Sequence, residues 1–126
     1  MMDYIASSKA PSALGPYSQA IKVGDFIYTS GQIGLNTEGV LAEGLEAQAK
    51  QVLNNLSAVL QEGGSDLGHV VKTTIFLANM EDFSKVNAIY ADFFGDHKPA
   101  RSTVAVKTLP LNALIEIEVV AIQTKV

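Results

Sequence analysis

The stretch LIEIEVVAIQ (residues 114–123) shows the clearest alternation of side chains in the chain and predicts a strand close to its C-terminus. Successive side chains of a strand point to opposite faces of the sheet. One face therefore carries only apolar side chains, those of Ile115, Ile117, Val119 and Ala121. The other face mixes carboxylates with large aliphatic groups, namely Glu116, Glu118, Val120 and Ile122. We expect the first face to pack on helices, and the second to form a subunit interface that could also hold a partly buried carboxylate.

Two stretches earlier in the chain change to a helical period. Apolar residues recur at steps of three and four from Leu45 and stop at Gly63, as in an amphipathic helix that ends at a glycine. A second helix is expected between a cap at Asn79 or Asp82 and a stop at Gly95. One side of this helix carries the large apolar residues Phe83, Val86, Tyr90, Phe93 and Phe94.

The other β-rich stretches predict further strands at Tyr4–Ala6, Gln19–Val23, Phe26–Ser30, Val70–Leu77 and Ser102–Val106. A Gly-Asp pair at positions 24–25 predicts a hairpin between the second and third of these. The expected order is β-β-β-α-β-α-β-β. The chain is therefore predicted to form one α+β domain over residues 1–126, with a single mixed sheet and two helices on one face.

Composition bounds the function. The chain has 126 residues, of which 48% are hydrophobic, so it is long enough and apolar enough for a real core. Its formal net charge is −4 and no basic run occurs, so nucleic acid is not expected as the main partner. The absence of cysteine excludes disulfides and thiolate chemistry. No leader and no membrane-spanning run is seen, so we expect a soluble cytoplasmic protein without membrane association.

Few residues can carry chemistry. His69 and His97 are the only histidines, and neither shows the spacing of a metal site, so we expect neither to act as a ligand or a base. Glycine motifs of nucleotide-binding folds and of serine hydrolases are also missing. The sequence thus predicts no metal and no organic cofactor.

Two charged residues at strand positions remain open to two interpretations. Arg101 follows Pro99 at the start of a strand, where a planar guanidinium suits two-point binding of a carboxylate. Spacing alone favours a surface ion pair instead. Glu116 lies on the mixed face and becomes a candidate general base if a second subunit covers it, because burial raises the pKa of a carboxyl. Spacing alone favours an edge carboxylate in water, and Glu118 shares the same face.

Three polar residues are weaker candidates. Tyr17 and Ser30 have glycine neighbours that allow a ligand to approach the backbone closely, although ordinary turn chemistry explains them equally well. Asn87 falls in the middle of the second predicted helix, beside its apolar stripe. Position alone favours a solvent-facing side chain there.

Together these segments resemble one family over essentially the whole chain, the RidA/YjgF family of reactive-intermediate deaminases. The C-terminal pattern is the most specific, with P-A-R-S followed about a dozen residues later by I-E-I-E. The matching stretches are GPYSQAI (15–21), FIYTSGQIG (26–34), VVKTTIFLANMEDFSKVNAIYADFF (70–94), PARSTVAV (99–106) and IEIEVVAI (115–122).

The resemblance implies a chorismate-mutase-like, ferredoxin-like α+β fold that assembles as a homotrimer, with ligand sites in the clefts between subunits. It implies hydrolytic deamination of 2-imino acids, such as 2-iminobutanoate and 2-iminopropanoate, or of their enamine tautomers, to 2-keto acids and ammonia. The family's carboxylate-binding arginine falls on Arg101 and its water-activating glutamate on Glu116. The substrate-binding residues of the family fall on Tyr17, Ser30, Gly31, Asn87 and Thr103, together with Arg101 itself.

One position departs from many members of that family, which have cysteine two residues after the arginine. This chain has Thr103, which keeps the backbone groups of the site but removes any thiol chemistry. Two other functions stay open: a non-catalytic trimer that binds small carboxylates such as 2-keto acids and regulates a partner, and a ribonuclease. The sequence favours the enzyme over the sensor because both the arginine and the glutamate are present, and the acidic charge argues against the ribonuclease.

Overall fold

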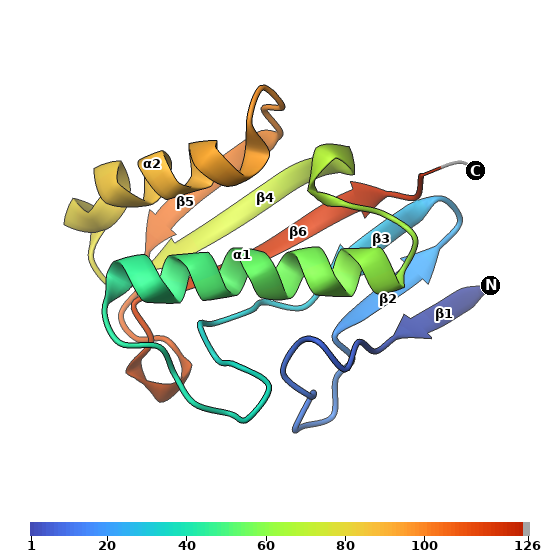
Figure 1. The fold of residues 1–126 in the computed structure, drawn as a ribbon, viewed down its shortest axis with the longest axis horizontal. Helices are drawn as coiled ribbons and strands as arrows, with labels where there is room; N and C mark the ends of the chain where they lie inside the picture. Colours follow the sequence, from blue (N-terminus) through green and yellow to red (C-terminus); the bar gives the residue numbers. More distant parts are fainter. Residues whose placement is uncertain (125–126) are drawn as a thin grey trace.

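The computed structural model describes residues 1–124 of the chain. Within that range the chain forms one six-stranded sheet, two α-helices and three short 3-10 helices (Figure 1). The strands are β1 (Met2–Ile5), β2 (Ala20–Val23), β3 (Phe26–Thr29), β4 (Val70–Leu77), β5 (Ala100–Ala105) and β6 (Ile115–Ile122). The helices are α1 (Leu45–Glu62) and α2 (Phe83–Phe94), and the 3-10 helices are η1 (Leu67–His69), η2 (Met80–Asp82) and η3 (Pro110–Asn112).

The predicted order of strands and α-helices is confirmed, and the sheet is mixed as expected. The strand order is β1-β2-β3-β6-β4-β5, and every neighbouring pair is antiparallel except β4 and β5. The parallel pair follows from the helix between its strands, because a crossover returns the chain to the same end of the sheet. The strand predicted at Ser102–Val106 starts earlier, at Ala100, which places Arg101 inside the ladder opposite Thr73.

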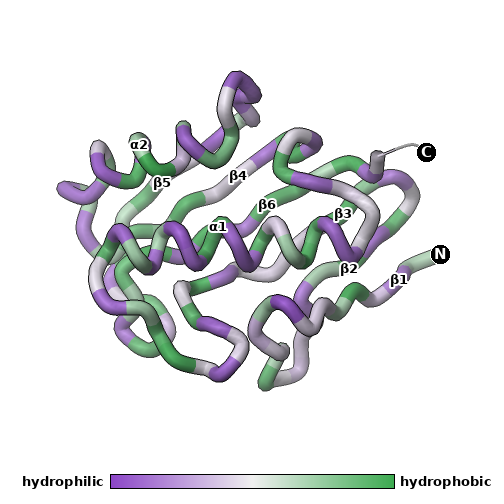
Figure 2. The backbone as a smooth tube through the Cα atoms, in the orientation of Figure 1, coloured by the Kyte–Doolittle hydropathy of each residue, from purple (hydrophilic) through white to green (hydrophobic). Residues whose placement is uncertain are grey.

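Both α-helices cover the same face of the sheet, α1 over the middle of the sheet and α2 over β4 and β5 (Figure 1). Figure 2 shows the period of α1 as alternating hydrophilic and hydrophobic positions, whereas β6 is hydrophobic over most of its length. The core lies between these layers. The face of β6 predicted to pack on helices is buried there, as shown by Ile115, Ile117, Val119 and Ala121. Burying such side chains contributes about 1.5–3 kcal/mol each for the larger aliphatics.

The opposite face of the sheet has no helix on it among residues 1–124 (Figure 1). It is unusually apolar for an exposed surface, because several strands present large side chains there. Those of Tyr4, Val23, Phe26, Tyr28 and Val104 are all at least 40% exposed. Exposed apolar side chains grouped in this way are typical of an interaction surface.

Local signals behave largely as predicted. Gly24 takes a positive φ of 58° in the two-residue turn between β2 and β3, a conformation that favours glycine. Of the two candidate caps before the second helix, Asn79 caps the short 3-10 helix η2 that precedes α2, where its side-chain oxygen accepts a hydrogen bond from Glu81 N at 2.9 Å, and Asp82 holds the N-cap position of α2. Asp82 makes no side-chain cap. No helix in the described part of the chain is long and apolar enough to cross a membrane.

Candidate functional site

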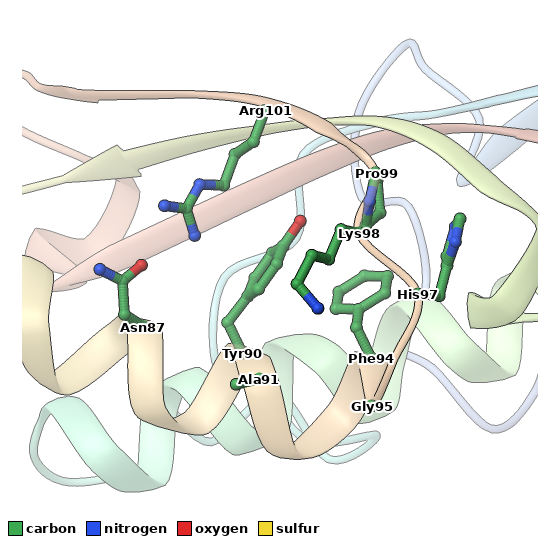
Figure 3. Close-up of a pocket in the computed structure, with 9 residues that line it drawn as sticks. All are labelled: Asn87, Tyr90, Ala91, Phe94, Gly95, His97, Lys98, Pro99 and Arg101. Carbon is green, nitrogen blue, oxygen red and sulfur yellow. The ribbon is translucent and has the colours of Figure 1, made fainter.

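The polar candidates line two separate hollows. The first, of about 510 Å³, lies between α2 and the start of β5 and contains Asn87 and Arg101 (Figure 3). The second, of about 390 Å³, lies beside β6 and contains Tyr17, Ser30, Gly31 and Glu116. We call them the arginine hollow and the glutamate hollow.

The side chain of Arg101 lies on the face of the sheet that the helices cover. Arg101 pairs with Thr73 across the parallel β4–β5 ladder, and Thr73 is fully buried beneath α2. Partners in register share a face of the sheet, so the arginine side chain lies on the helix side. There its guanidinium carbon is 4.9 Å from the centre of the Tyr90 ring and 5.4 Å from that of Phe83.

No carboxylate pairs with this guanidinium within the described part of the chain. The three ion pairs found there involve Asp3, Glu46 and Asp66 with other cations. The surface ion pair that spacing favoured for Arg101 is therefore not formed. Among residues 1–124, the guanidinium contacts aromatic rings, and its N–H groups have no hydrogen-bond partner.

Asn87 stands beside the arginine in the same hollow. Its side chain projects from the middle of α2 toward the guanidinium (Figure 3). Its Oδ1 is buried and has no hydrogen-bond partner among the described residues. The solvent-facing position that spacing favoured is thus wrong, because the helix turns this residue toward β5. An unpartnered buried oxygen of this kind is an acceptor available to a ligand.

Glu116 lies on the other side of the sheet. It pairs with Phe76 of β4 and alternates with the buried Ile115 and Ile117, so its side chain points away from the helices. Burial raises the pKa of this carboxyl, and the nearby charge of Glu118 raises it further. Glu118 is exposed and lines neither hollow. The structure thereby distinguishes two glutamates that alternation alone could not separate.

Glycine 31 makes room for this carboxylate. A Cβ atom at that position would overlap Glu116 Oε2 and come within 2.8 Å of Glu116 Cδ. Next to it, the Ser30 hydroxyl donates to the Ser18 carbonyl at 2.6 Å, and Tyr17 stands at the rim with 56% of its side chain exposed. The resemblance grouped these residues, and the fold brings all of them to the same hollow.

Thr103 belongs to neither lining. It is two residues beyond Arg101 on β5 and therefore on the same face, opposite Ile75. Its hydroxyl is buried without a hydrogen-bond partner in residues 1–124.

A single chain does not bring Arg101 and Glu116 together. Arg101 lies on the face of the sheet that the helices cover, and Glu116 lies on the uncovered face. The two strands that carry them, β5 and β6, are separated by β4. Each hollow is therefore one half of the set of residues that the resemblance implies.

Buried amides that sequence reasoning missed hold the loops around the glutamate hollow. Gln48 of α1 donates to the Ala42 carbonyl at 3.0 Å and accepts from Leu114 N at 2.8 Å. Asn55 donates to the Leu35 carbonyl at 2.8 Å. The signal was present in the sequence as two amides on the apolar stripe of the first helix, where a polar residue needs a buried partner.

The histidines make local contacts. His69 Nδ1 lies 2.7 Å from Asp66 Oδ1, and His97 Nε2 donates to the Val70 carbonyl at 2.6 Å. Within residues 1–124 no three His, Asp or Glu side chains are grouped in a way that could hold a metal ion.

Comparison with known proteins gives independent evidence about the family of this chain. The family model described as endoribonuclease L-PSP matches residues 7–123. The 2-iminobutanoate/2-iminopropanoate deaminase of Homo sapiens is 46% identical over 121 residues, covering 94% of this chain and 88% of its own length. The putative regulator AldR of Lactococcus lactis is 51% identical over 122 residues, covering 95% and 97%.

The solved structures agree with this. The crystal structure of E. coli TdcF with bound serine superposes with a TM-score of 0.92 at 34% identity, covering 97% of this chain and 99% of that one. Fold, motifs and relatives therefore coincide, and the chain belongs to the endoribonuclease L-PSP family, which is the RidA/YjgF family that its motifs resemble.

Proposed function

We propose that this protein is a hydrolase that converts 2-imino acids, or their enamine tautomers, to 2-keto acids and ammonia. The observation that carries the proposal is a guanidinium held on aromatic rings without a counter-charge, in a chain that also holds a partly buried carboxylate of raised pKa. The human relative named for this reaction, 46% identical, supports the same activity.

Arg101 binds the substrate carboxylate. Two parallel N–H donors of a guanidinium match the two oxygens of a carboxylate, which fixes the orientation of the substrate as well as its position. The unpartnered Oδ1 of Asn87 provides an acceptor beside it. That TdcF binds serine, a small amino acid with a carboxylate, is consistent with a site of this class in the family.

Glu116 acts as the general base. Burial and the charge of Glu118 raise its pKa, which brings it closer to the pH at which a base is effective. It takes a proton from water as the water oxygen forms a bond to the imine carbon. Protonated Glu116 then returns this proton to the nitrogen of the carbinolamine. The C–N bond breaks as the C=O bond forms, the hydroxyl proton passes to the departing ammonia, and the carboxylate is regenerated. Because a protonated imine is already electrophilic, the residues need only to position the water and accept its proton.

The two hollows meet between subunits. Arg101 sits at the edge strand β5, and Glu116 lies on the uncovered sheet face of the same chain. A chorismate-mutase-like homotrimer would cover the apolar outer face and place the arginine hollow of one subunit against the glutamate hollow of the next. The exposed aromatic and aliphatic side chains of that face support such an assembly.

The test is a coupled assay in which the imine is generated freshly and keto-acid release is followed. We expect Arg101→Ala and Glu116→Gln to lower the rate over the uncatalysed reaction by about 10²- to 10³-fold. Glu118→Gln is the matched control, because it removes the same charge from the same strand outside both hollows. Equal rates for wild type and Arg101→Ala would refute the proposal.

A second candidate is a non-catalytic regulator that binds 2-keto acids. It is favoured by the name of the 51% identical relative, a putative regulator, and by the arginine hollow alone. Tight binding of 2-ketobutyrate that is lost in Arg101→Ala, without turnover of any imine, would select it. The word endoribonuclease in the family description prompts a further control: RNA cleavage by purified protein that persists in Arg101→Ala would have to arise outside this site.

A further inference from the structure

Helix α2 presents three side chains in a row to the start of β5. Phe83, Asn87 and Tyr90 are spaced by four and then three residues, which places them on one face of the helix over two turns. The two rings are the outer members of this row, and both lie within 5.4 Å of the Arg101 guanidinium carbon. The aromatic pair thus contacts the arginine from both ends of the row.

These two rings are the recorded contacts of the guanidinium within the described residues. Arg101 makes no hydrogen bond and no ion pair through its side chain within residues 1–124. An arginine without such contacts would sample many rotamers, and binding a ligand would then cost the entropy of ordering it. A guanidinium over an aromatic face is attracted by the ring quadrupole, by about 0.5–2 kcal/mol per ring.

Tyr90 is itself held firmly. Its hydroxyl is 2.9 Å from Thr73 Oγ1, and its ring packs on that of Phe94 with centres 4.5 Å apart. Thr73 is the fully buried residue opposite Arg101 in the β4–β5 ladder. The same rung of the sheet therefore carries the arginine and the anchor of its ring. Burial raises the pKa of the Tyr90 phenol, which keeps it neutral at any working pH.

We propose that Phe83 and Tyr90 are positioning residues that hold the Arg101 guanidinium in the orientation that receives a carboxylate, while leaving its N–H donors unpaired. An acidic residue in their place would also hold the arginine but would compete with the ligand. Aromatic rings hold the cation without occupying its donors in the plane of the guanidinium. The inference rests on the proposed carboxylate site at Arg101.

An NMR experiment tests directly whether the rings of Phe83 and Tyr90 lie against the guanidinium of Arg101. Arg101 is the only arginine in the chain, so its side-chain Nε–H gives a single resonance in an NMR spectrum of the whole protein. Two rings at this distance displace that resonance from its random-coil position through their ring currents. We expect Tyr90→Leu to move the Arg101 resonance most of the way back to its random-coil chemical shift, and Phe83→Leu to move it part of the way. Tyr90→Phe should leave the chemical shift as in the wild type.

The second arm measures binding of 2-ketobutyrate by titration of the same samples. We expect Tyr90→Leu to weaken binding about tenfold and Phe83→Leu about threefold, whereas Tyr90→Phe stays within about twofold because the ring remains. Phe93→Leu is the matched control, since it removes a half-buried ring from the same helix that does not contact Arg101. Phe93→Leu should lower the unfolding temperature but leave the Arg101 chemical shift and the affinity for 2-ketobutyrate unchanged.

The outcomes separate the two proposals. An Arg101 resonance and a 2-ketobutyrate affinity that are unchanged in both Tyr90→Leu and Phe83→Leu would overturn the positioning role. Wild-type protein that neither binds 2-ketobutyrate nor accelerates imine hydrolysis would overturn the proposed function. The Arg101 resonance would still show whether the two rings lie against the guanidinium. Equal weakening in Tyr90→Phe and Tyr90→Leu would assign the effect to the Thr73 hydrogen bond and contradict the role of the ring.

Discussion

The arginine hollow and the glutamate hollow lie on opposite faces of one sheet and hold their charged groups by different means. In the first, a cation at the edge strand β5 rests on two rings of α2 and has no counter-charge. In the second, a carboxylate on the inner strand β6 occupies the space left by a glycine, and burial together with a second glutamate raises its pKa. Within the described residues, neither group is paired with an opposite charge.

The difference fits the two roles proposed for Arg101 and Glu116. A residue that binds a carboxylate needs a fixed orientation and free donors, which aromatic rings provide. A residue that accepts a proton needs a pKa closer to neutrality, which burial and a like charge provide. Under the proposed function each hollow supplies one half of a site shared between two chains, and each variant below disturbs one hollow at a time.

Among variants that keep both Arg101 and Glu116, the largest effect should come from Gly31→Ala, which disturbs only the glutamate hollow. The new Cβ would displace the end of the Glu116 side chain, and a misplacement of about 1 Å can cost about 100-fold in rate. We expect kcat to fall by about that factor while affinity for 2-ketobutyrate stays within about threefold. Gly68→Ala, at a glycine that lines neither hollow, is the control. A Gly31→Ala enzyme with full activity would contradict the placement of the base.

Arg101→Lys should give the next largest effect, this time in the arginine hollow. Lysine keeps the charge but loses the planar pair of donors and the stacked contact with Tyr90. We expect kcat/KM to fall by about 10- to 30-fold and 2-ketobutyrate to bind correspondingly less tightly. Lys85→Arg, the reverse exchange at an exposed position of α2, should leave both unchanged. Wild-type kinetics in Arg101→Lys would mean that charge alone suffices.

Glu118→Gln should move the pH dependence without abolishing activity. The Glu118 charge raises the pKa of Glu116, so its removal lowers that pKa and keeps the base ionised at lower pH. The acid limb of kcat/KM against pH should therefore shift to lower pH, by less than about one unit because both groups are partly exposed. Glu81→Gln serves as a remote control. A shift to higher pH would contradict the cause assigned here.

The smallest effect should be on stability. Glu116 has a folded-state pKa above its ordinary value, so its ionised form disfavours the folded state at pH 7, and this penalty disappears as pH falls below the ordinary pKa. Glu116→Gln should therefore unfold at a temperature equal to wild type or up to about 2 °C higher at pH 7, with the difference gone near pH 4. A clear loss of thermal stability at pH 7 would show that the carboxylate is structural.

The fold was largely predictable because its signals are local. The alternation from Ile115 to Ile122 separated the core face from the uncovered face, and the glycine stops bounded both helices. The beginning of β5 was missed by two residues, since Ala100 and Arg101 carry no β signal of their own and the ladder with β4 extends over them.

The site was predictable only in part. Resemblance selected the residues, and their grouping into the glutamate hollow follows from the path of the chain around Gly31. The role of Asn87 could not be read from helical spacing alone, because it depends on which strand α2 covers. The aromatic support of Arg101 likewise needs the tertiary contact between α2 and β5, which pairs residues 83 and 90 with residue 101.

In the proposed site, Arg101 and Glu116 come from different chains, and mixing two impaired variants tests this pairing. Arg101→Ala and Glu116→Gln chains would be co-expressed in equal amounts, and the mixed assemblies assayed for imine hydrolysis. If each site takes its arginine from one chain and its glutamate from another, about a quarter of the sites regain both residues, and about a quarter of the wild-type activity should return. Mixtures no more active than the separate variants would contradict the account.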